Sequence, residues 1–267
     1  ASSGGRLSQI RSTMSNRLDA VSFSCARISA RRNWRCVTRW VIFAADAKYA
    51  VGRFDGKTFT PEDEGKRQVH WGKFYASQTY NNTPDGRRIQ IGWAQIAMDG
   101  MPFNQMMAFP CELSLRSTED GIRLFAKPAK EIDSLHKKRH ALEAATFNAG
   151  ETKELAVAGD LLEIRAEFEV GEAKSFGIEV AGAKVSYDAA KNTLLNMPLK
   201  PEGGKIRMQI LVDRASLEVC GNDGRVYLTQ PLNNPGELKS VRVFSEEKAA
   251  KLLNLEVFEL KSVWSTE

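Results

Sequence analysis

Long apolar runs are missing from this sequence of 267 residues. No stretch approaches the roughly 18 consecutive apolar residues of a membrane-spanning helix, so no membrane partner is expected. The first residues also lack the short apolar region of a secretory signal peptide. With 42% hydrophobic and 27% charged residues, the composition is that of an ordinary globular protein of one or two domains.

Histidine and cysteine are scarce, at three and four residues. No Cys-x-x-Cys pair occurs, and the histidines are not spaced with the cysteines as zinc ligands would be. Isolated thiols usually pack as small apolar side chains. The sequence therefore predicts no metal and no other cofactor.

Acidic residues are nearly missing from the first 36 residues, which contain seven arginines and one acid, Asp19, for a net charge of +6. The whole chain carries +5, so the remainder stands near neutrality at −1 and shows no basic face for nucleic acid. Residues 1–36 also show neither helical nor strand periodicity. They fit an organelle transit peptide, a disordered tail, or residues outside the native reading frame, and we favour the last.

From about Val37 the sequence changes to short β patterns. The turn signal Glu119-Asp120-Gly121 joins the last two strands of this region as a hairpin. Strands are predicted at residues 40–45, 49–54, 58–61, 74–80, 88–97, 111–117 and 121–126.

Residues 127–145 interrupt this pattern with a charged, weakly helical stretch, which predicts a linker with one short helix. His136 and His140 are four residues apart and would share a face of that helix. Only Lys and Arg lie between them, without the carboxylate of an HExxH metal motif, so a solvated face is expected.

A second β region covers residues 146–267. Within residues 161–170, apolar side chains alternate with charged ones, so Leu162 and Ile164 are expected in the core and Glu163 in solvent. Three more strands follow in residues 205–229, and two more are predicted at residues 240–245 and 253–264. Strands at short spacing without intervening helices favour an antiparallel β-sandwich.

Five runs in the sequence carry a resemblance to a known family. They read, in order, WVIFAADAKYAVGRFDGKTFTPE, FYASQTY, GRRIQIGWAQ, MPFNQMMAFPCELSLR and ILVDRASLEVCGNDG. With the closing run FELKSVW they closely resemble the C-terminal half of glycoside hydrolase family 32, the invertase, levanase and inulinase family. The resemblance covers residues 37–264. It implies an all-β fold in which residues 37–126 form the last blade or blades of a five-bladed β-propeller and residues 146–267 a β-sandwich.

The resemblance also implies hydrolysis of fructosyl bonds in sucrose, levan or inulin with retention of configuration. That chemistry needs a carboxylate nucleophile and a carboxylic acid/base about 5–5.5 Å apart. In the family the nucleophile lies in an Asn-Asp-Pro sequence, a transition-state-stabilising Asp in Arg-Asp-Pro, and the acid/base in Glu-Cys. None of these three sequences occurs here. Glu112 follows Cys111 in the reverse order and is expected to be structural. No catalytic residue is therefore assigned, and the chain is expected to be inactive alone.

Aromatic side chains of the family's last blade contribute to the axial sugar pocket. The matching positions are Tyr75 in FYASQ and Trp93 in IGWAQ, where a ring can stack on the apolar face of a sugar. The alternative is that both rings belong to the blade core. Family members commonly have one more residue before FYA than the Gly72-Lys73-Phe74 sequence found here. Such a deletion would turn Tyr75 to the other face unless a bulge absorbs it.

Two functions remain open. In the first, the chain is the non-catalytic half of a β-fructosidase, truncated or frame-shifted before Val37. Its partner would be a fructose-containing oligo- or polysaccharide, and its full-length parent would be secreted or periplasmic. In the second, the β-sandwich is a non-catalytic module that binds carbohydrate or serves a structural role.

Overall fold

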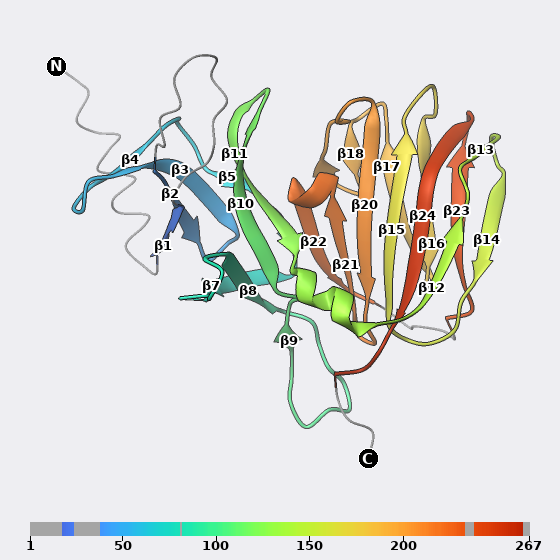
Figure 1. The fold of residues 1–267 in the computed structure, drawn as a ribbon, viewed down its shortest axis with the longest axis horizontal. Helices are drawn as coiled ribbons and strands as arrows, with labels where there is room; N and C mark the ends of the chain where they lie inside the picture. The colour runs from blue at the N-terminus through green and yellow to red at the C-terminus, as the bar shows by residue number, and fades with distance from the viewer. Residues whose placement is uncertain (1–17, 24–37, 81, 233–237, 264–267) are drawn as a thin grey trace.

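The computed structural model describes residues 18–23, 38–80, 82–232 and 238–263. Antiparallel strands dominate these residues, and Figure 1 shows two small sheets followed by a large two-layered sandwich. The predicted all-β architecture of propeller blades and a sandwich is confirmed. Within the described ranges, no helix combines the length and apolar character that a membrane crossing needs.

The first small sheet includes a strand that precedes the predicted boundary at Val37. Its order is β1-β2-β3-β4, with β5 also paired to β3. The strands are β1 (Leu18–Phe23), β2 (Arg39–Ala44), β3 (Lys48–Phe54), β4 (Phe59–Pro61) and β5 (Arg67–Gln68). The expectation of no regular structure in residues 1–36 is thus corrected for β1, which is defined by its pairing with β2 and not by a periodic pattern of its own. The rest of that segment, with Cys25 and Cys36, lies outside the described residues.

The second small sheet carries the predicted hairpin and both predicted aromatic residues. Its order is β11-β10-β8-β7, with β9 paired to β8. The strands are β7 (Phe74–Thr79), β8 (Arg88–Ala94), β9 (Met106–Met107), β10 (Cys111–Thr118) and β11 (Gly121–Pro128). Each small sheet is a twisted antiparallel meander of the kind that forms a propeller blade.

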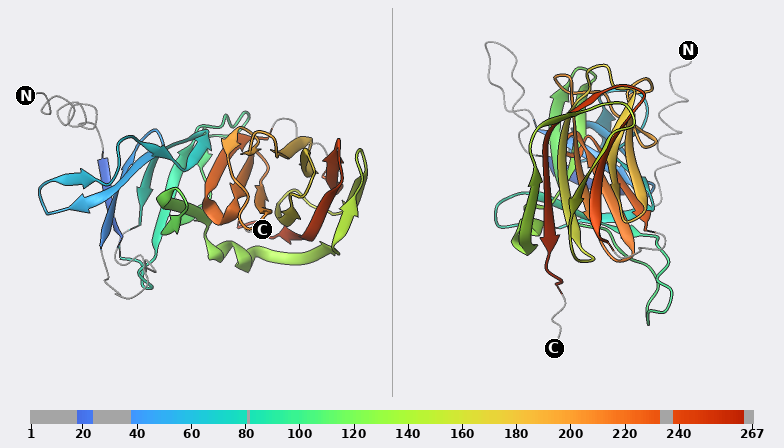
Figure 2. Two further views of the ribbon diagram at one scale, coloured as in Figure 1. Left: turned by 90° about the horizontal axis from the view of Figure 1, so that it is seen from above. Right: turned by 90° about the vertical axis from the view of Figure 1, so that its right-hand side faces the viewer.

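The sandwich consists of an eight-stranded and a six-stranded sheet, drawn as facing layers in Figure 2. The first contains β6 (His70–Gly72), β12 (His136–Leu142), β13 (Ala145–Phe147), β15 (Leu162–Glu169), β20 (Lys205–Val212), β21 (Ser216–Gly221), β22 (Val226–Pro231) and β24 (Ala250–Leu260). The second contains β14 (Thr152–Ala156), β16 (Ser175–Val180), β17 (Ala183–Asp188), β18 (Thr193–Leu194), β19 (Met197–Pro198) and β23 (Ser240–Glu246). Two 3-10 helices, η1 (Lys130–Leu135) and η2 (Asn222–Gly224), complete the elements.

The sandwich has its own apolar core, whose buried members all lie between Phe147 and Val257. The alternation predicted in β15 is observed, since Leu162, Ile164 and Phe168 are fully buried between the sheets. A core built entirely from this part of the chain gives the sandwich the means to fold as a unit.

The blades are joined to the sandwich through one strand of its eight-stranded sheet and through the core of the blades. β6, which precedes the second blade, pairs in parallel with β22 of the sandwich. The core of the blades also includes two sandwich residues, Cys220 and Tyr227. The junction is therefore a packed interface, with the two parts of the chain joined at main-chain level.

The expected linker is largely part of the sandwich. Residues 130–135 form η1, but His136 and His140 lie on strand β12, which pairs with β24. The prediction of a helix face for these histidines is wrong, because a paired neighbour outweighs the weak helical propensity of the segment. The sandwich sheet consequently begins about ten residues before the predicted start at residue 146.

Candidate functional site

The structure places Tyr75 and Trp93 directly opposite each other on neighbouring strands of the second blade. They are cross-strand partners in β7 and β8, and their ring centroids are 6.1 Å apart with the planes at 68°. Both side chains are open to solvent, with 39% and 38% of their surface exposed. Neither ring is part of the buried apolar core of the described residues, whose members are nearly inaccessible.

A β-bulge follows Tyr75 in β7. The register of β7 against β8 shifts between Tyr75 and Gln78, and Ala76 takes a left-handed φ of 43°. The N–H of Ala76 turns to the first blade and donates to the carbonyl of Ala45 at 3.0 Å. Tyr75 lies just before this bulge and is exposed, whereas its neighbour Phe74 is buried, as the alternation of a strand requires.

Packing beneath the rings depends on a glycine. Phe74 is buried and its ring stacks on that of His70, with centroids 3.8 Å apart. On the facing strand, a Cβ added at Gly92 would lie 2.3 Å from the Phe74 ring. Only glycine leaves room there, so the residue before Trp93 lets the inner ring pack while the outer ring faces solvent.

Met107 completes the exposed group, which we call the aromatic site (Tyr75, Trp93 and Met107). Met107 on β9 is the cross-strand partner of Trp93 and is 52% exposed. The sequence analysis did not identify this residue, although Met107 lies shortly before the alternating pattern that predicts β10. Two inclined rings and a thioether on an open surface form an apolar platform of the kind that binds the C–H face of a sugar.

A buried polar group at the junction was also missed by sequence reasoning. Glu218 on β21 is 1% exposed; its Oε1 accepts the N–H of Phe109 at 3.1 Å and its Oε2 accepts the hydroxyl of Tyr227 at 2.5 Å. Burial raises the pKa of Glu218 from 4.5 to about 8, although both hydrogen bonds act to lower it. Nothing in the run SLEVCG distinguishes this acid from one on a solvated face, because its burial depends on the blade.

His70 lies on the blade side of the same junction. It is fully buried, and its Nε2–H donates to Oε1 of Gln90 at 3.0 Å. Burial lowers the pKa of His70 from 6.5 to about 3, and the bond to Gln90 opposes this. The imidazole is therefore neutral at physiological pH and serves as an aromatic core residue beneath the aromatic site.

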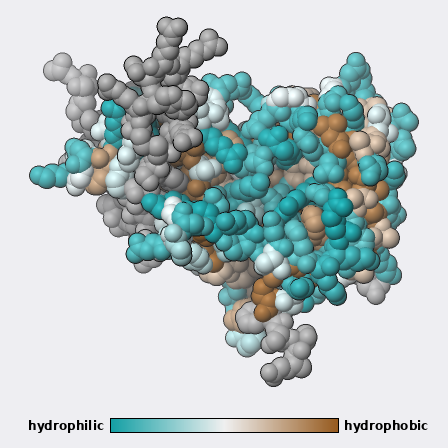
Figure 3. Space-filling view, in the orientation of Figure 1, coloured by the Kyte–Doolittle hydropathy of each residue, from teal (hydrophilic) through white to brown (hydrophobic). Residues whose placement is uncertain are grey.

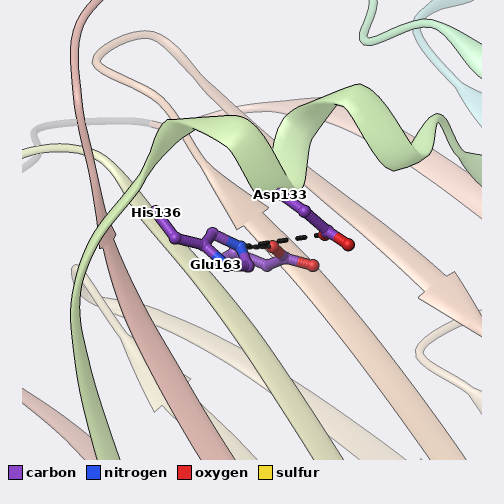
Figure 4. A group of neighbouring side chains, drawn as sticks. All are labelled: Asp133, His136 and Glu163. Carbon is purple, nitrogen blue, oxygen red and sulfur yellow. Dashed lines mark hydrogen bonds and ion pairs between the residues drawn. The ribbon is translucent and has the colours of Figure 1, made fainter.

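A second polar cluster brings Asp133, His136 and Glu163 together, as Figure 4 shows, with three possible ligand atoms within 4.8 Å of one another. The distance from His136 Nε2 to Glu163 Oε2 is 2.6 Å, which is that of a hydrogen bond. Arg165 forms ion pairs with both Asp133 and Glu163, and Gln209 donates to Glu163 at 2.6 Å. The guanidinium supplies the positive charge that a cation would bring, so the residues present do not fit a metal.

The same cluster corrects the expectation that Glu163 faces solvent. Its side chain is fully buried because η1 and β12 cover this end of β15. His136 also stacks on Phe258 with centroids 3.9 Å apart, while Nε2 of His140 lies 2.7 Å from the carboxylate of Glu259. Both histidines thus tie β12 to the body of the sandwich.

A polar cleft of 480 Å³ separates β10 and β11 from the eight-stranded sheet. Ion pairs form its walls, such as Lys127 and Arg207 with Asp223 at 3.1 and 2.7 Å. Glu112 lines the cleft and lies 3.4 Å from Arg87, which also binds Glu131. Glu112 is thus held in an ion pair in the cleft, and Figure 3 shows a largely hydrophilic face on this side of the molecule.

Solved glycosidase structures share this fold. Exo-inulinase from Aspergillus awamori aligns with a TM-score of 0.75 at 23% identity, over 92% of this chain and 56% of that structure. The β-fructofuranosidase from Schwanniomyces occidentalis aligns with a TM-score of 0.72 at 17% identity, over 92% of this chain and 60% of that structure. The fold is thus that of the exo-inulinase and fructofuranosidase glycosidases.

Family models extend this to the sequence. The model "Glycosyl hydrolases family 32 N-terminal domain" matches residues 21–128, and "Glycosyl hydrolases family 32 C terminal" matches residues 131–259. Together the two matches cover most of the chain, which belongs to glycoside hydrolase family 32. The first match begins at residue 21, so the expected start of the likeness at residue 37 is corrected.

Curated relatives agree with this assignment. Levanases from Bacillus sp. (strain L7) and Bacillus subtilis (strain 168) are each 30% identical over 82% of this chain, and cover 28% and 38% of their own lengths. An extracellular exo-inulinase from Aspergillus niger is 25% identical over 85% of this chain and 52% of its own length. The chain thus spans between about a quarter and a half of these relatives.

Proposed function

We propose that this chain belongs to a β-fructosidase that hydrolyses fructosyl bonds in fructose-containing oligo- or polysaccharides, and that its aromatic site contacts the sugar. The carrying observation is the exposed pair of Tyr75 and Trp93 on the blade that matches the family's N-terminal domain. The relatives include levanases and an exo-inulinase, which supports fructans as the substrate class. The exo-inulinase from Aspergillus niger is extracellular, which supports a secreted parent protein.

The arrangement of the site suits sugar contact and not bond cleavage. The rings are inclined to each other, so one can stack on an apolar sugar face while the Tyr75 hydroxyl donates to or accepts from a sugar hydroxyl. Glu163 and Glu218 are the fully buried carboxylates among the described residues, and each already accepts hydrogen bonds from side chains or main chain. We infer that residues 1–267 alone do not turn over substrate, since the three family motifs for the catalytic carboxylates do not occur in them.

Hydrolysis assays of the full chain with sucrose, levan and inulin test the activity. We expect no release of fructose above a catalyst-free control. Measurable turnover would show that carboxylates within these residues perform the chemistry, and the inference of inactivity would then be abandoned.

Sugar contact is tested by binding of 1-kestose to the full chain, measured by calorimetry. Trp93→Ala and Tyr75→Ala are each expected to raise Kd about tenfold, because each removes one face of the platform. Tyr80→Ala is the matched control, since Tyr80 is 49% exposed and lies just beyond β7. Equal affinities for all three variants and the wild type would exclude the aromatic site as the contact.

The second candidate is a non-catalytic sandwich module, which the separate core between Phe147 and Val257 favours. In this case the sandwich by itself would resist protease and bind the polymer, and the blades would contribute nothing. Limited proteolysis followed by pull-down with insoluble levan distinguishes the two. If the sandwich still binds levan after the blades have been removed, the module is supported. If removal of the blades abolishes binding, the aromatic site is supported.

A further inference from the structure

The sandwich holds the main chain next to the aromatic site. Phe109 lies two residues after Met107, and its N–H donates to the carboxylate of Glu218 at 3.1 Å. On the other side of the same segment, Ala108 N–H donates to the carbonyl of Gly92 at 2.8 Å. The segment that carries Met107 is thus bonded to β8 on one side and to a side chain of the sandwich on the other.

The other strand of the site is attached to the sandwich in a similar way. Lys73, two residues before Tyr75, donates its N–H to the carbonyl of Thr229 on β22 at 2.8 Å. Gly72 takes a left-handed φ of 75°, and a Cβ there would lie 2.2 Å from the same carbonyl oxygen. The chain therefore passes in direct contact with β22 before it turns into β7.

Tyr227 connects these two attachments. Its hydroxyl donates to Glu218, and its N–H donates to the carbonyl of Val69 at 2.9 Å. Its ring meets the edge of His70, with centroids 5.2 Å apart, and His70 in turn stacks on Phe74. Glu218 is thus part of a continuous set of contacts that reaches the underside of the aromatic site.

The carboxyl group of Glu218 accepts two hydrogen bonds within a buried strand. All six residues of β21 are buried, and an unpaired polar group there would cost far more than it returns. Replacement of both partners of a buried polar contact by apolar residues can be neutral or stabilising, whereas loss of Glu218 alone would leave the N–H of Phe109 and the hydroxyl of Tyr227 without their acceptor. What an apolar residue cannot do is accept the N–H of Phe109.

We infer that Glu218 is a positioning residue: it fixes the main chain at Phe109 and so sets Met107 and Trp93 for sugar contact. The sandwich would thereby determine the geometry of a binding site that lies entirely on the blade. This inference rests on the proposed function of the aromatic site as the sugar contact.

The test uses the full chain and four variants. Glu218→Met, with Glu218→Leu as a second apolar replacement should the first not fold, removes the acceptor while keeping the volume. Glu218→Gln keeps an acceptor oxygen for Phe109. Ser216→Ala is the matched control, because Ser216 lies on the same strand, is fully buried, and has a hydroxyl without a hydrogen-bond partner among the described residues. The measurements are amide deuterium exchange at Phe109, Kd for 1-kestose, and the urea midpoint.

In the apolar variants, exchange at Phe109 should accelerate about tenfold and Kd should rise about tenfold, and the urea midpoint should fall because Phe109 and Tyr227 lose their acceptor. Glu218→Gln and Ser216→Ala should leave exchange and Kd close to wild type. Unchanged exchange in an apolar variant, or faster exchange with unchanged Kd, would overturn the positioning role. Failure of the wild type to bind 1-kestose would instead refute the proposed function, and exchange at Phe109 would then decide alone whether Glu218 positions that segment.

Discussion

Stability of this protein should fall as the pH rises from 6.5 to 8, and Glu218 should be the cause. Burial raises the pKa of its carboxyl group to about 8, whereas that of an unperturbed glutamate is 4.5. Between these values the folded chain binds one more proton than the unfolded chain. The free energy of unfolding therefore decreases with rising pH, by about 1.4 kcal/mol per pH unit for one such group.

His70 restricts the range in which this decrease is visible. Its pKa is lowered to about 3 from 6.5, so the unfolded chain binds the extra proton between these values and stability rises with pH. The opposite slopes of His70 and Glu218 cancel between pH 4.5 and 6.5. Of these two groups only Glu218 contributes from pH 6.5 to 8, and this interval of about 1.5 units corresponds to about 2 kcal/mol.

The assay is urea unfolding followed by far-ultraviolet circular dichroism at pH 6.5, 7.0, 7.5 and 8.0 for the wild type and Glu218→Gln. The wild type should lose about 2 kcal/mol over this range and the variant almost nothing. The range ends at pH 8 because burial also raises the pKa of Cys220, to about 12, and exposed thiols ionise from about pH 8.5 in the unfolded chain. Parallel pH profiles for the two proteins would refute the assignment of the slope to Glu218.

Three substitutions give further predictions. Gly92→Ala should lower the free energy of unfolding by about 1–3 kcal/mol in urea unfolding, since the new methyl group would overlap the ring of Phe74; an unchanged midpoint would contradict this packing. Ala76→Gly should raise it by up to about 1 kcal/mol, because glycine adopts the left-handed φ at that bulge without strain, and a loss of stability would count against the bulge. Arg165→Met should cost about 3–5 kcal/mol by leaving the buried Glu163 without its cation, and added Zn²⁺ should not restore the loss; recovery of the thermal midpoint by Zn²⁺ would indicate a metal site after all.

Local patterns in the sequence predict most of the strands correctly. β2, β3, β7, β10, β11, β15 and β20 to β24 all occur within a few residues of their predicted places. Turn signals are equally reliable, as at Glu119-Asp120-Gly121, where the β10–β11 hairpin turns. These features depend on side-chain alternation and on turn residues, which neighbouring residues in the chain determine by themselves.

The sequence predicts the candidate site in part. It identifies Tyr75 and Trp93, but it contains no signal for the bulge at Ala76 or for the pairing of β9 that places Met107 beside Trp93. It also assigns His136 and His140 to a helix, because nothing local reveals that β24 pairs with this segment. Contacts between residues more than 100 positions apart in the chain leave no periodic trace.

By itself, then, the sequence determined the all-β fold, the order of blades and sandwich, and the aromatic residues of the candidate site. The tertiary structure alone decided that Glu163 and Glu218 are buried, since each acid alternates with apolar neighbours as a solvent-facing residue would. It also decided that β6 joins the sandwich sheet and that the sandwich bonds to the blade beside the aromatic site. The physical reason is the same in each case: burial of a polar side chain depends on which distant segment covers it and supplies its hydrogen bonds.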